Sequence, residues 1–482
     1  MPMPVPMSAK IPQSLLLSLL LCAAALLAAC SQPGPVGAPP SDSATDVPAA
    51  NATNGDSPDG DSEPQPVVTW YYYDQDNTDP EANERVGNAY LARAIPQFNA
   101  DHAGQYTWVN VPRDYNLSLD LVTAVQNNGE IPDVMRMSIN NMPTFIRNNT
   151  VQDLTDFVMN SEWAADLNPT ALEACRGPDG DIYCIPLSAS PYVVFYWTDY
   201  FPNGFPTTPA ALLEAAADLQ DEDIYALTYW GSTALDGEGT GRYYYQVIRS
   251  FGGSYDDGAG NMQLDTPENI AAIEFMRAIV AGGYSPEAVF MGNFEEEDAF
   301  KRSLAAAFPT GYFSAYLYLN PLTAPDGTEY ATVSSQDMEA AVDAGDIAIA
   351  PFVAPPDQMP GCHTDYFGFV IPNGAPNRDG AEAYINWIME PANQIEWVLQ
   401  AGGGAPVSQA LRTQEAFQTP FFQQGLAAAE RSDCAPWFGS LLRIPEAKRI
   451  ISNVFFDLVR GDATQDIAQA LQRAEDEYNA LP

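Results

Sequence analysis

The sequence contains few cationic residues. Lys and Arg number 20 against 63 Asp and Glu, so that the 482 residues carry a formal net charge of −43. A surface of this charge repels the phosphates of nucleic acids, which excludes nucleic acid as a partner. It also disfavours adsorption of the folded body to anionic lipid, and it says little about the fold.

Residues and motifs typical of common enzyme classes are also scarce. Histidine occurs only at His102 and His363, and the sequence has no GxSxG, HExxH or P-loop motif. A carboxylate pair of the kind that glycosidases use can always be found among 63 acidic residues, so it indicates nothing. We therefore predict a protein that is not an enzyme and has no cofactor, with a secreted glycan-acting enzyme as the alternative.

Cysteine is rare, and no CxxC or Cys/His cluster predicts a metal site. Beyond the N-terminal segment the cysteines are Cys175, Cys184, Cys362 and Cys434. An even number in an oxidising compartment favours disulfides, and four cysteines allow three pairings. Cys175 and Cys184 flank a strong turn signal at 177–180 (GPDG), which favours a bridge across this hairpin and a second bridge between Cys362 and Cys434. Free buried thiols are the alternative.

Apolar runs approaching the length of a membrane span are confined to the first 30 residues. Lys10 is the only charge before the run 15–29, which ends in small residues and predicts a secretory signal. The run stops at 27–30 (LAAC), which resembles the lipobox of bacterial lipoproteins, where the cysteine is lipidated and becomes the mature N-terminus. We predict a lipoprotein signal peptide over 1–29, which removes Cys22, and lipidation of Cys30. An ordinary signal peptide with a chance cysteine is the alternative.

Residues 30–66 are rich in Pro, Ser, Gly, Ala and Asp and contain no aromatic residue. Such a segment cannot bury enough apolar surface to fold, so we predict a disordered tether. As a flexible coil it would span roughly 30 Å and hold the folded body off the membrane.

From residue 67 the hydrophobic pattern alternates between strands and helices. Strands are predicted at 67–73, 106–111, 132–137, 192–196, 303–308 and 367–371. Helices are predicted at 80–99, 117–127, 209–219, 267–280, 379–389 and as two helices within 445–478, and Pro96 is expected to end the first of them early. Strand–helix alternation is typical of a parallel α/β sheet, and the length of the chain exceeds what one core fills.

Several sequence blocks occur in a distinctive order. They are 121–134 (LVTAVQNNGEIPDV), 150–158 (TVQDLTDFV), 183–201 (YCIPLSASPYVVFYWTDYF), 206–219 (PTTPAALLEAAADL), 251–253, 264–265, 305–313 (AAAFPTGYF), 379–394 and 401–406. Together they resemble the family 1 extracellular solute-binding proteins of ABC importers, the maltose-binding type, over essentially all of 67–482. Two positions depart from the family pattern: Trp197 replaces an Asn and Cys184 replaces a Gly.

The resemblance implies an α/β, two-lobed periplasmic-binding-protein-like fold with hinge crossings and an interlobe cleft. Lobe 1 would comprise 67–184 with 366–428, and lobe 2 would comprise 185–361 with 429–482. The chain would cross between the lobes near 184–186, near 362–366 and near Glu430. A bridge between Cys362 and Cys434 would then lie beside the hinge and limit how the lobes move.

The same resemblance implies the function. We expect a monomeric, extracytoplasmic substrate-binding lipoprotein, anchored to the membrane by lipid, that captures a sugar or oligosaccharide by lobe closure and passes it to the permease subunits of an ABC importer. A receptor for a non-sugar solute and a lipoprotein that binds another macromolecule are further alternatives.

Sugar binding needs flat aromatic platforms and polar groups that pair with hydroxyls. The predicted ligand contacts lie at strand ends or match aromatic cleft positions of the family: Tyr72, Asp74, Ser138, Asn140, Ser190, Trp230, Tyr312, Phe313, Tyr366 and Trp437. Trp70 and Trp108 lie in mid-strand and are predicted to be core. Arg136, Arg242 and Arg249 could hold an anionic ligand, but we interpret them as solvated surface residues.

Overall fold

The computed structural model describes residues 63–79, 82, 84–114, 117–234, 238–292, 295–332, 336–402, 404–461 and 464–481. The chain divides into two units, 1–60 and 61–482, and every described element belongs to the second. The predicted signal peptide and Cys30 lie outside the described residues, as does the tether up to residue 62. No helix among the described residues is both long and apolar enough to cross a membrane.

One mixed sheet of ten strands organises the described part of the chain. Its order is β2-β1-β3-β10-β4-β6-β5, with β9 and β11 paired to β4 and β12 paired to β10. These strands are β1 (Gln65–Tyr71), β2 (Tyr106–Pro112), β3 (Val134–Ser138), β4 (Ile185–Trp197), β5 (Tyr225–Leu227), β6 (Ala305–Gly311), β9 (Ile347–Ala350), β10 (Gly361–Val370), β11 (Ala405–Pro406) and β12 (Asp433–Ala435). A separate pair joins β7 (Leu322–Thr323) to β8 (Glu329–Tyr330).

Helices connect and cover these strands. They are α2 (Arg85–Asp101), α3 (Leu117–Asn127), α4 (Met142–Arg147), α5 (Thr155–Asn160), α6 (Pro169–Glu173), α7 (Pro209–Gln220), α8 (Glu238–Ser250), α9 (Pro267–Ala281), α10 (Glu295–Lys301), α11 (Tyr312–Tyr318), α12 (Gln336–Ala344), α13 (Arg378–Met389), α14 (Pro391–Trp397), α15 (Pro420–Glu430), α16 (Ile444–Arg460) and α17 (Ile467–Asn479). Thr208 and Thr266 cap the N-termini of α7 and α9 by accepting backbone N–H bonds, each before a proline at the first helical position.

The predicted order of the first elements is confirmed. β1 pairs in parallel with both β2 and β3, and α2 and α3 connect them. β1 begins at Gln65, two residues inside the segment predicted as tether. The expectation that Pro96 ends the first helix is wrong, because α2 continues to Asp101. Leu91, Ala94 and Phe98 are buried along one face of α2, and this packing outweighs the hydrogen bond that proline removes.

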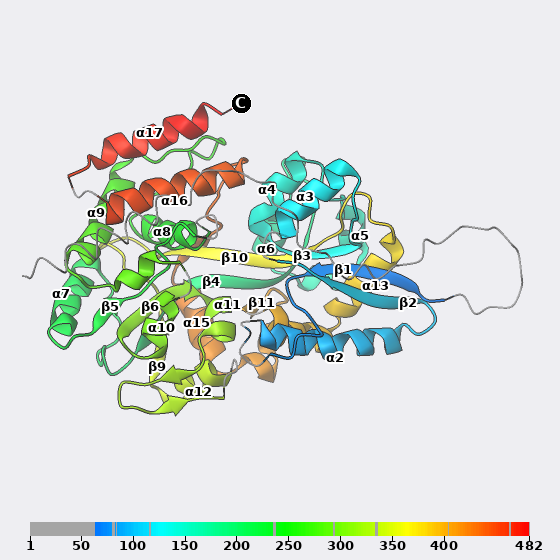
Figure 1. Ribbon diagram of the computed structural model, residues 1–482, viewed down its shortest axis with the longest axis horizontal. Coiled ribbons are helices and arrows are strands. Elements are labelled where there is room, and N and C mark those ends of the chain that lie inside the picture. Colours follow the sequence, from blue (N-terminus) through cyan, green and yellow to red (C-terminus); the bar gives the residue numbers. More distant parts are fainter. Residues whose placement is uncertain are drawn as a thin grey trace, which may run out of the picture. The chain divides into compact units, whose positions relative to one another are not determined.

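Two long strands, β4 and β10, run side by side through the sheet (Figure 1). The first part of β4 pairs with β10 and β11, and from Tyr192 onward β4 pairs with β6 and β9 instead. β10 pairs with β12 at its start and with β3 at its end. The predicted strands 192–196 and 367–371 are therefore only parts of longer strands. Pro186, Pro191 and the intervening serines of β4 concealed its first half, because proline is uncommon inside sheets.

The buried side chains form two hydrophobic cores. The first core surrounds β1, β2, β3, α2 and α13, and it extends to Phe195, Phe308 and Tyr312. The second core lies among α7, α8, α9, α16 and α17. Trp70 and Trp108 are 4% and 2% exposed, which confirms them as core residues. The proposed lobe boundaries stay a prediction.

Candidate functional site

The aromatic side of the candidate site lies where β1 and β3 end. Tyr72 follows β1 and is partly buried, whereas Arg136 of β3 is 3% exposed. Arg136 Nη1 donates to the Tyr72 hydroxyl, and the guanidinium carbon lies 5.0 Å from the Tyr72 ring centroid and 4.4 Å from that of Phe367. Burial lowers the pKa of Arg136, but Tyr72 and Tyr73 are among the tyrosines that outweigh this effect and hold the pKa above its usual value. The interpretation of Arg136 as a solvated residue is wrong.

Tyr73 links the Tyr72 ring to the segment that contains Ala401. The Tyr72 ring lies edge-on to Tyr73 at 4.5 Å, and the Tyr73 hydroxyl donates to the Ala401 carbonyl at 2.6 Å. Burial, followed by Tyr72 and Tyr318, raises the pKa of Tyr73. Tyr318, at the end of α11, is partly buried and packs against the first core. A few residues further along, Asn320 accepts a hydrogen bond from Arg85 of α2.

The polar side of the candidate site centres on Asp365 of β10, which is 2% exposed. Asn140 Nδ2 donates to Asp365 Oδ1, His363 Nε2 lies 3.1 Å from the same oxygen, and Arg242 Nε lies 3.0 Å from Oδ2. Burial alone raises the pKa of Asp365, but Arg242, His363 and Asn140 outweigh burial and hold that pKa at about 2. The side chain of Arg242 is 13% exposed, so its interpretation as a solvated residue is also wrong.

His363 is the histidine beside Asp365 on the same strand. His363 is fully buried and its ring lies 5.0 Å from that of Tyr192. Burial lowers the pKa of His363 more than the adjacent Asp365 raises it. His363 Nε2 therefore lies close to a carboxylate whose positive partner is Arg242.

Three predicted contacts surround Asp365. Asn140 binds it directly, Ser138 accepts the backbone N–H of Asn140 at 3.4 Å, and Ser190 of β4 lies opposite Asp365 in the strand register. The sequence analysis missed Asp365 itself. Nothing in the local pattern distinguishes it from the other acidic residues, although its neighbour Tyr366 was among the predicted contacts.

The remaining predicted contacts are spread more widely. Asp74 accepts the Asp76 N–H at 2.9 Å in the turn after β1, and the partly buried Tyr366 points to the opposite face from Asp365. Trp230 follows β5, is partly buried and packs against the first core. Tyr312 is 2% exposed and donates to the Phe421 carbonyl, and Trp437 is 1% exposed in the second core. The Phe313 side chain lies outside the described part of the structure.

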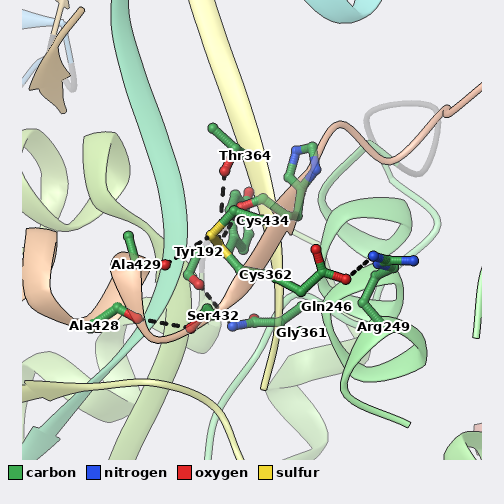
Figure 2. The surroundings of a disulfide bond; sticks show 12 residues. Tyr192, Gln246, Arg249, Gly361, Cys362, Thr364, Ala428, Ala429, Ser432 and Cys434 are labelled. Carbon is green, nitrogen blue, oxygen red and sulfur yellow. Dashed lines mark hydrogen bonds and ion pairs between the residues drawn. A yellow bond between two sulfur atoms is a disulfide. The ribbon is translucent and has the colours of Figure 1, made fainter. Parts of the chain in front are cut away.

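Both disulfides predicted from the cysteine spacing are present. Cys175 joins Cys184 across the turn, with the Cα atoms 5.1 Å apart. Cys362 of β10 joins Cys434 of β12, at positions that pair in the parallel register. Figure 2 shows this second bridge beside Tyr192 of β4, whose carbonyl accepts a hydrogen bond from Gln246 at 2.9 Å. The bridge therefore lies close to β4, β10 and β12 at once.

A groove of about 1010 Å³ lies apart from these residues. It runs between α5, α13 and the segment 408–414, and its walls include Asp156, Phe157, Trp163, Glu382 and Gln414. None of the ten predicted contacts lines it. We place the candidate site at the ends of β1 and β3 and along β10, because partly buried aromatic rings and buried polar groups from separate parts of the chain meet there.

Residues 93–424 match the family model described as bacterial extracellular solute-binding protein. The chain belongs to this family. Maltose-bound MalE3 of T. maritima is similar in structure, with a TM-score of 0.68, 17% sequence identity, and coverage of 86% of this chain and 98% of that chain. The GacH receptor of Streptomyces glaucescens is similar with a TM-score of 0.68 and 16% sequence identity, over 86% of this chain and 98% of that chain. An ABC transporter solute-binding protein of Thermotoga lettingae bound with α-D-tagatose is similar with a TM-score of 0.68 and 18% sequence identity, over 86% of this chain and 99% of that chain.

These similarities confirm the predicted family and the α/β fold of two-lobed binding proteins. Membership of an extracellular solute-binding family also confirms the predicted extracytoplasmic solute-binding role, in which such proteins work with ABC transporter permeases. No curated protein matches the sequence at a significant level.

We expect Asp365→Asn to lower the free energy of unfolding by about 3 kcal/mol at pH 7, because it removes the charge that Arg242 faces in a nearly dry site. The matched control is Asp433→Asn, which breaks the Arg249–Asp433 pair where the carboxylate side chain is 52% exposed, and it should change stability by less than about 1 kcal/mol. Urea unfolding of both variants measures the difference, and equal effects would refute the importance of Asp365.

The pH dependence gives a second readout for the same variant. The folded-state pKa of Asp365 is depressed to about 2, so its contribution is present above the unfolded value near 4 and is lost as the pH falls through 2. Wild type should lose roughly 2 kcal/mol between pH 4 and pH 2 that Asp365→Asn does not lose.

Proposed function

We propose that the chain captures a sugar or a related polyol by closing two lobes around it and delivers it to an ABC importer. The observation that carries the proposal is the partly exposed Tyr72 ring, which Arg136 holds against Phe367 of β10, the strand that also carries the polar cluster around Asp365. Tyr72, Trp230, Tyr318 and Tyr366 are partly buried rings that pack against the first core. Similar structures contain maltose, acarbose, α-D-tagatose and ribitol, which are all hydroxyl-rich.

The chemistry of such ligands fits these residues. Aromatic faces such as that of the partly exposed Tyr72 pack against the apolar C–H face of a sugar ring, and amide and hydroxyl groups can pair with its hydroxyls. A ligand that touches both lobes only in the closed arrangement shifts the equilibrium toward closure by that difference in contacts. Binding without chemical change of the sugar is part of the proposal, and turnover of a glycan is the alternative.

A thermal-shift panel of maltose, acarbose, D-tagatose and ribitol tests the proposal. A specific ligand at 100 times its dissociation constant adds roughly 2.7 kcal/mol of stability, which should raise the melting temperature by about 2 °C or more. Trp230→Ala should weaken binding by at least about tenfold, because buried aromatic anchors carry much of the affinity at binding sites. The matched control is Trp163→Ala in the groove between α5, α13 and the segment 408–414, which should leave affinity unchanged. A panel without any shift, or release of a new sugar product, contradicts the proposal.

We also propose that the Cys362–Cys434 bridge limits lobe movement, because it joins β10 to β12 beside the point where β4 changes its strand partners. Replacing both cysteines with serine should increase the radius of gyration of the ligand-free protein in X-ray scattering. The matched control is the variant with serine at both Cys175 and Cys184. Its free energy of unfolding should fall by a similar amount, roughly 2–4 kcal/mol, but its radius of gyration should not increase. Unchanged scattering from the first variant would contradict this role.

The lipid anchor is proposed from the sequence alone. If Cys30 is lipidated, Cys30→Ser expressed in a bacterial host should move the protein from the membrane fraction to the soluble extracytoplasmic fraction. The control is Cys22→Ser, which lies inside the predicted signal peptide and should leave the protein in the membrane fraction. Membrane association that persists in Cys30→Ser would contradict the anchor.

A further inference from the structure

Tyr72 lies one residue beyond the end of β1, so the strand ladder does not fix its ring. Its position is set by side chains instead. The hydroxyl accepts a hydrogen bond from Arg136 Nη1 and lies 3.3 Å from the Tyr73 hydroxyl, and the two tyrosine rings meet edge to face. A partly exposed ring that is held in this way can act as a rigid platform.

Arg136 is itself held firmly. It is in the middle of β3, whose residues pair with β10, and its guanidinium carbon lies 4.4 Å from the Phe367 ring and 5.8 Å from the Trp397 ring. The Trp397 indole N–H in turn donates to the Tyr71 hydroxyl at 2.9 Å. The group that fixes Tyr72 is thus anchored in the first core by several aromatic neighbours.

We propose that Arg136 is a positioning residue that pre-organises the Tyr72 ring for the ligand. The inference rests on the proposed sugar-binding function and assigns a role to a residue that does not itself touch the sugar. Arg136 is 3% exposed whereas Tyr72 is partly exposed, so a ligand reaches the ring and not the guanidinium. Freezing a mobile side chain during binding weakens affinity, and a ring that is already fixed avoids this loss.

The charge of Arg136 suits this role. A guanidinium combines a hydrogen bond to the hydroxyl with contacts to several ring faces, because it is planar and weakly hydrated. It also stays protonated across the physiological range, so the platform should not depend on pH between about 5 and 9. A neutral or flexible side chain at this position would supply only part of these contacts.

A double-mutant cycle tests the proposal. Affinity for the tightest binder among maltose, acarbose, D-tagatose and ribitol is measured by titration calorimetry for wild type, Arg136→Met, Tyr72→Ala and the double variant. If Arg136 acts through Tyr72, Arg136→Met should weaken binding by about tenfold in wild type and by less than about twofold in the Tyr72→Ala background. Should Tyr72→Ala bind too weakly to measure, Tyr72→Phe takes its place and should again reduce the effect of Arg136→Met.

The matched control is Arg113→Met. Arg113 lies 4.1 Å from the Trp70 ring centroid, so the variant removes a similar arginine–aromatic contact that does not involve the Tyr72 ring, and it should leave affinity unchanged. Arg136→Lys, which keeps the charge but not the planar fork, replaces Arg136→Met in the cycle if the latter fails to fold.

The outcomes separate this inference from the proposed function. Equal weakening in both backgrounds would mean that Arg136 acts independently of Tyr72, and no weakening in wild type would mean that it has no role in binding; either result overturns the inference while sugar binding stands. If wild type binds no member of the panel, the proposed function itself fails.

Discussion

The pairing of β4 with β10 is the constraint on which the rest of the structure depends. All 13 residues of β4 are buried, so each of its backbone polar groups must be satisfied by neighbouring strands or side chains. The position of β10 then fixes β3 on one side, and the second half of β4 fixes β6 and β9. Gly368 allows the close approach of the two strands, because a Cβ there would lie 2.2 Å from the Ile185 carbonyl oxygen.

The pairing of β4 with β10 also positions the charged side chains that are buried beside these strands. Arg242 and Asn140 reach Asp365 of β10 from α8 and from the residues that follow β3, so two separate parts of the chain engage one carboxylate. Arg136 of the adjacent β3 lies among aromatic rings. The buried charges are thus engaged by the protein itself. What the region offers to a ligand is the partly exposed ring of Tyr72, which suits a neutral molecule with apolar C–H faces better than an ion.

Much of the fold could be predicted from local sequence patterns. The parallel order of β1, β2 and β3 follows from alternating strand and helix signals, and the bounds of α3 match the prediction. The length of β4 could not be predicted in this way, because proline and serine hide a strand that is stabilised only by its neighbours. β4 is recognised from its pairing with neighbouring strands and not from the strand propensity of its own residues.

The candidate site was less predictable than the fold, for a different reason. Asn140 and Asp365 are separated by 225 residues, and no local pattern reports that they meet. The prediction that Arg136 and Arg242 are solvated was wrong for the same reason. Only the folded chain brings aromatic rings to Arg136 and a carboxylate to Arg242. The aromatic residues at strand ends were easier to select, but sequence could not separate Tyr72, which is partly exposed, from Tyr312, which is buried.

The two departures from the family pattern can now be understood as packing changes. Cys184 joins Cys175 in a disulfide just before β4, which holds the start of that strand. Trp197 at the other end of β4 is fully buried, donates its indole N–H to the Phe300 carbonyl at 3.0 Å and stacks on the Phe300 ring at 5.4 Å. Both residues therefore hold the ends of β4, on either side of the position where Ser190 lies opposite Asp365.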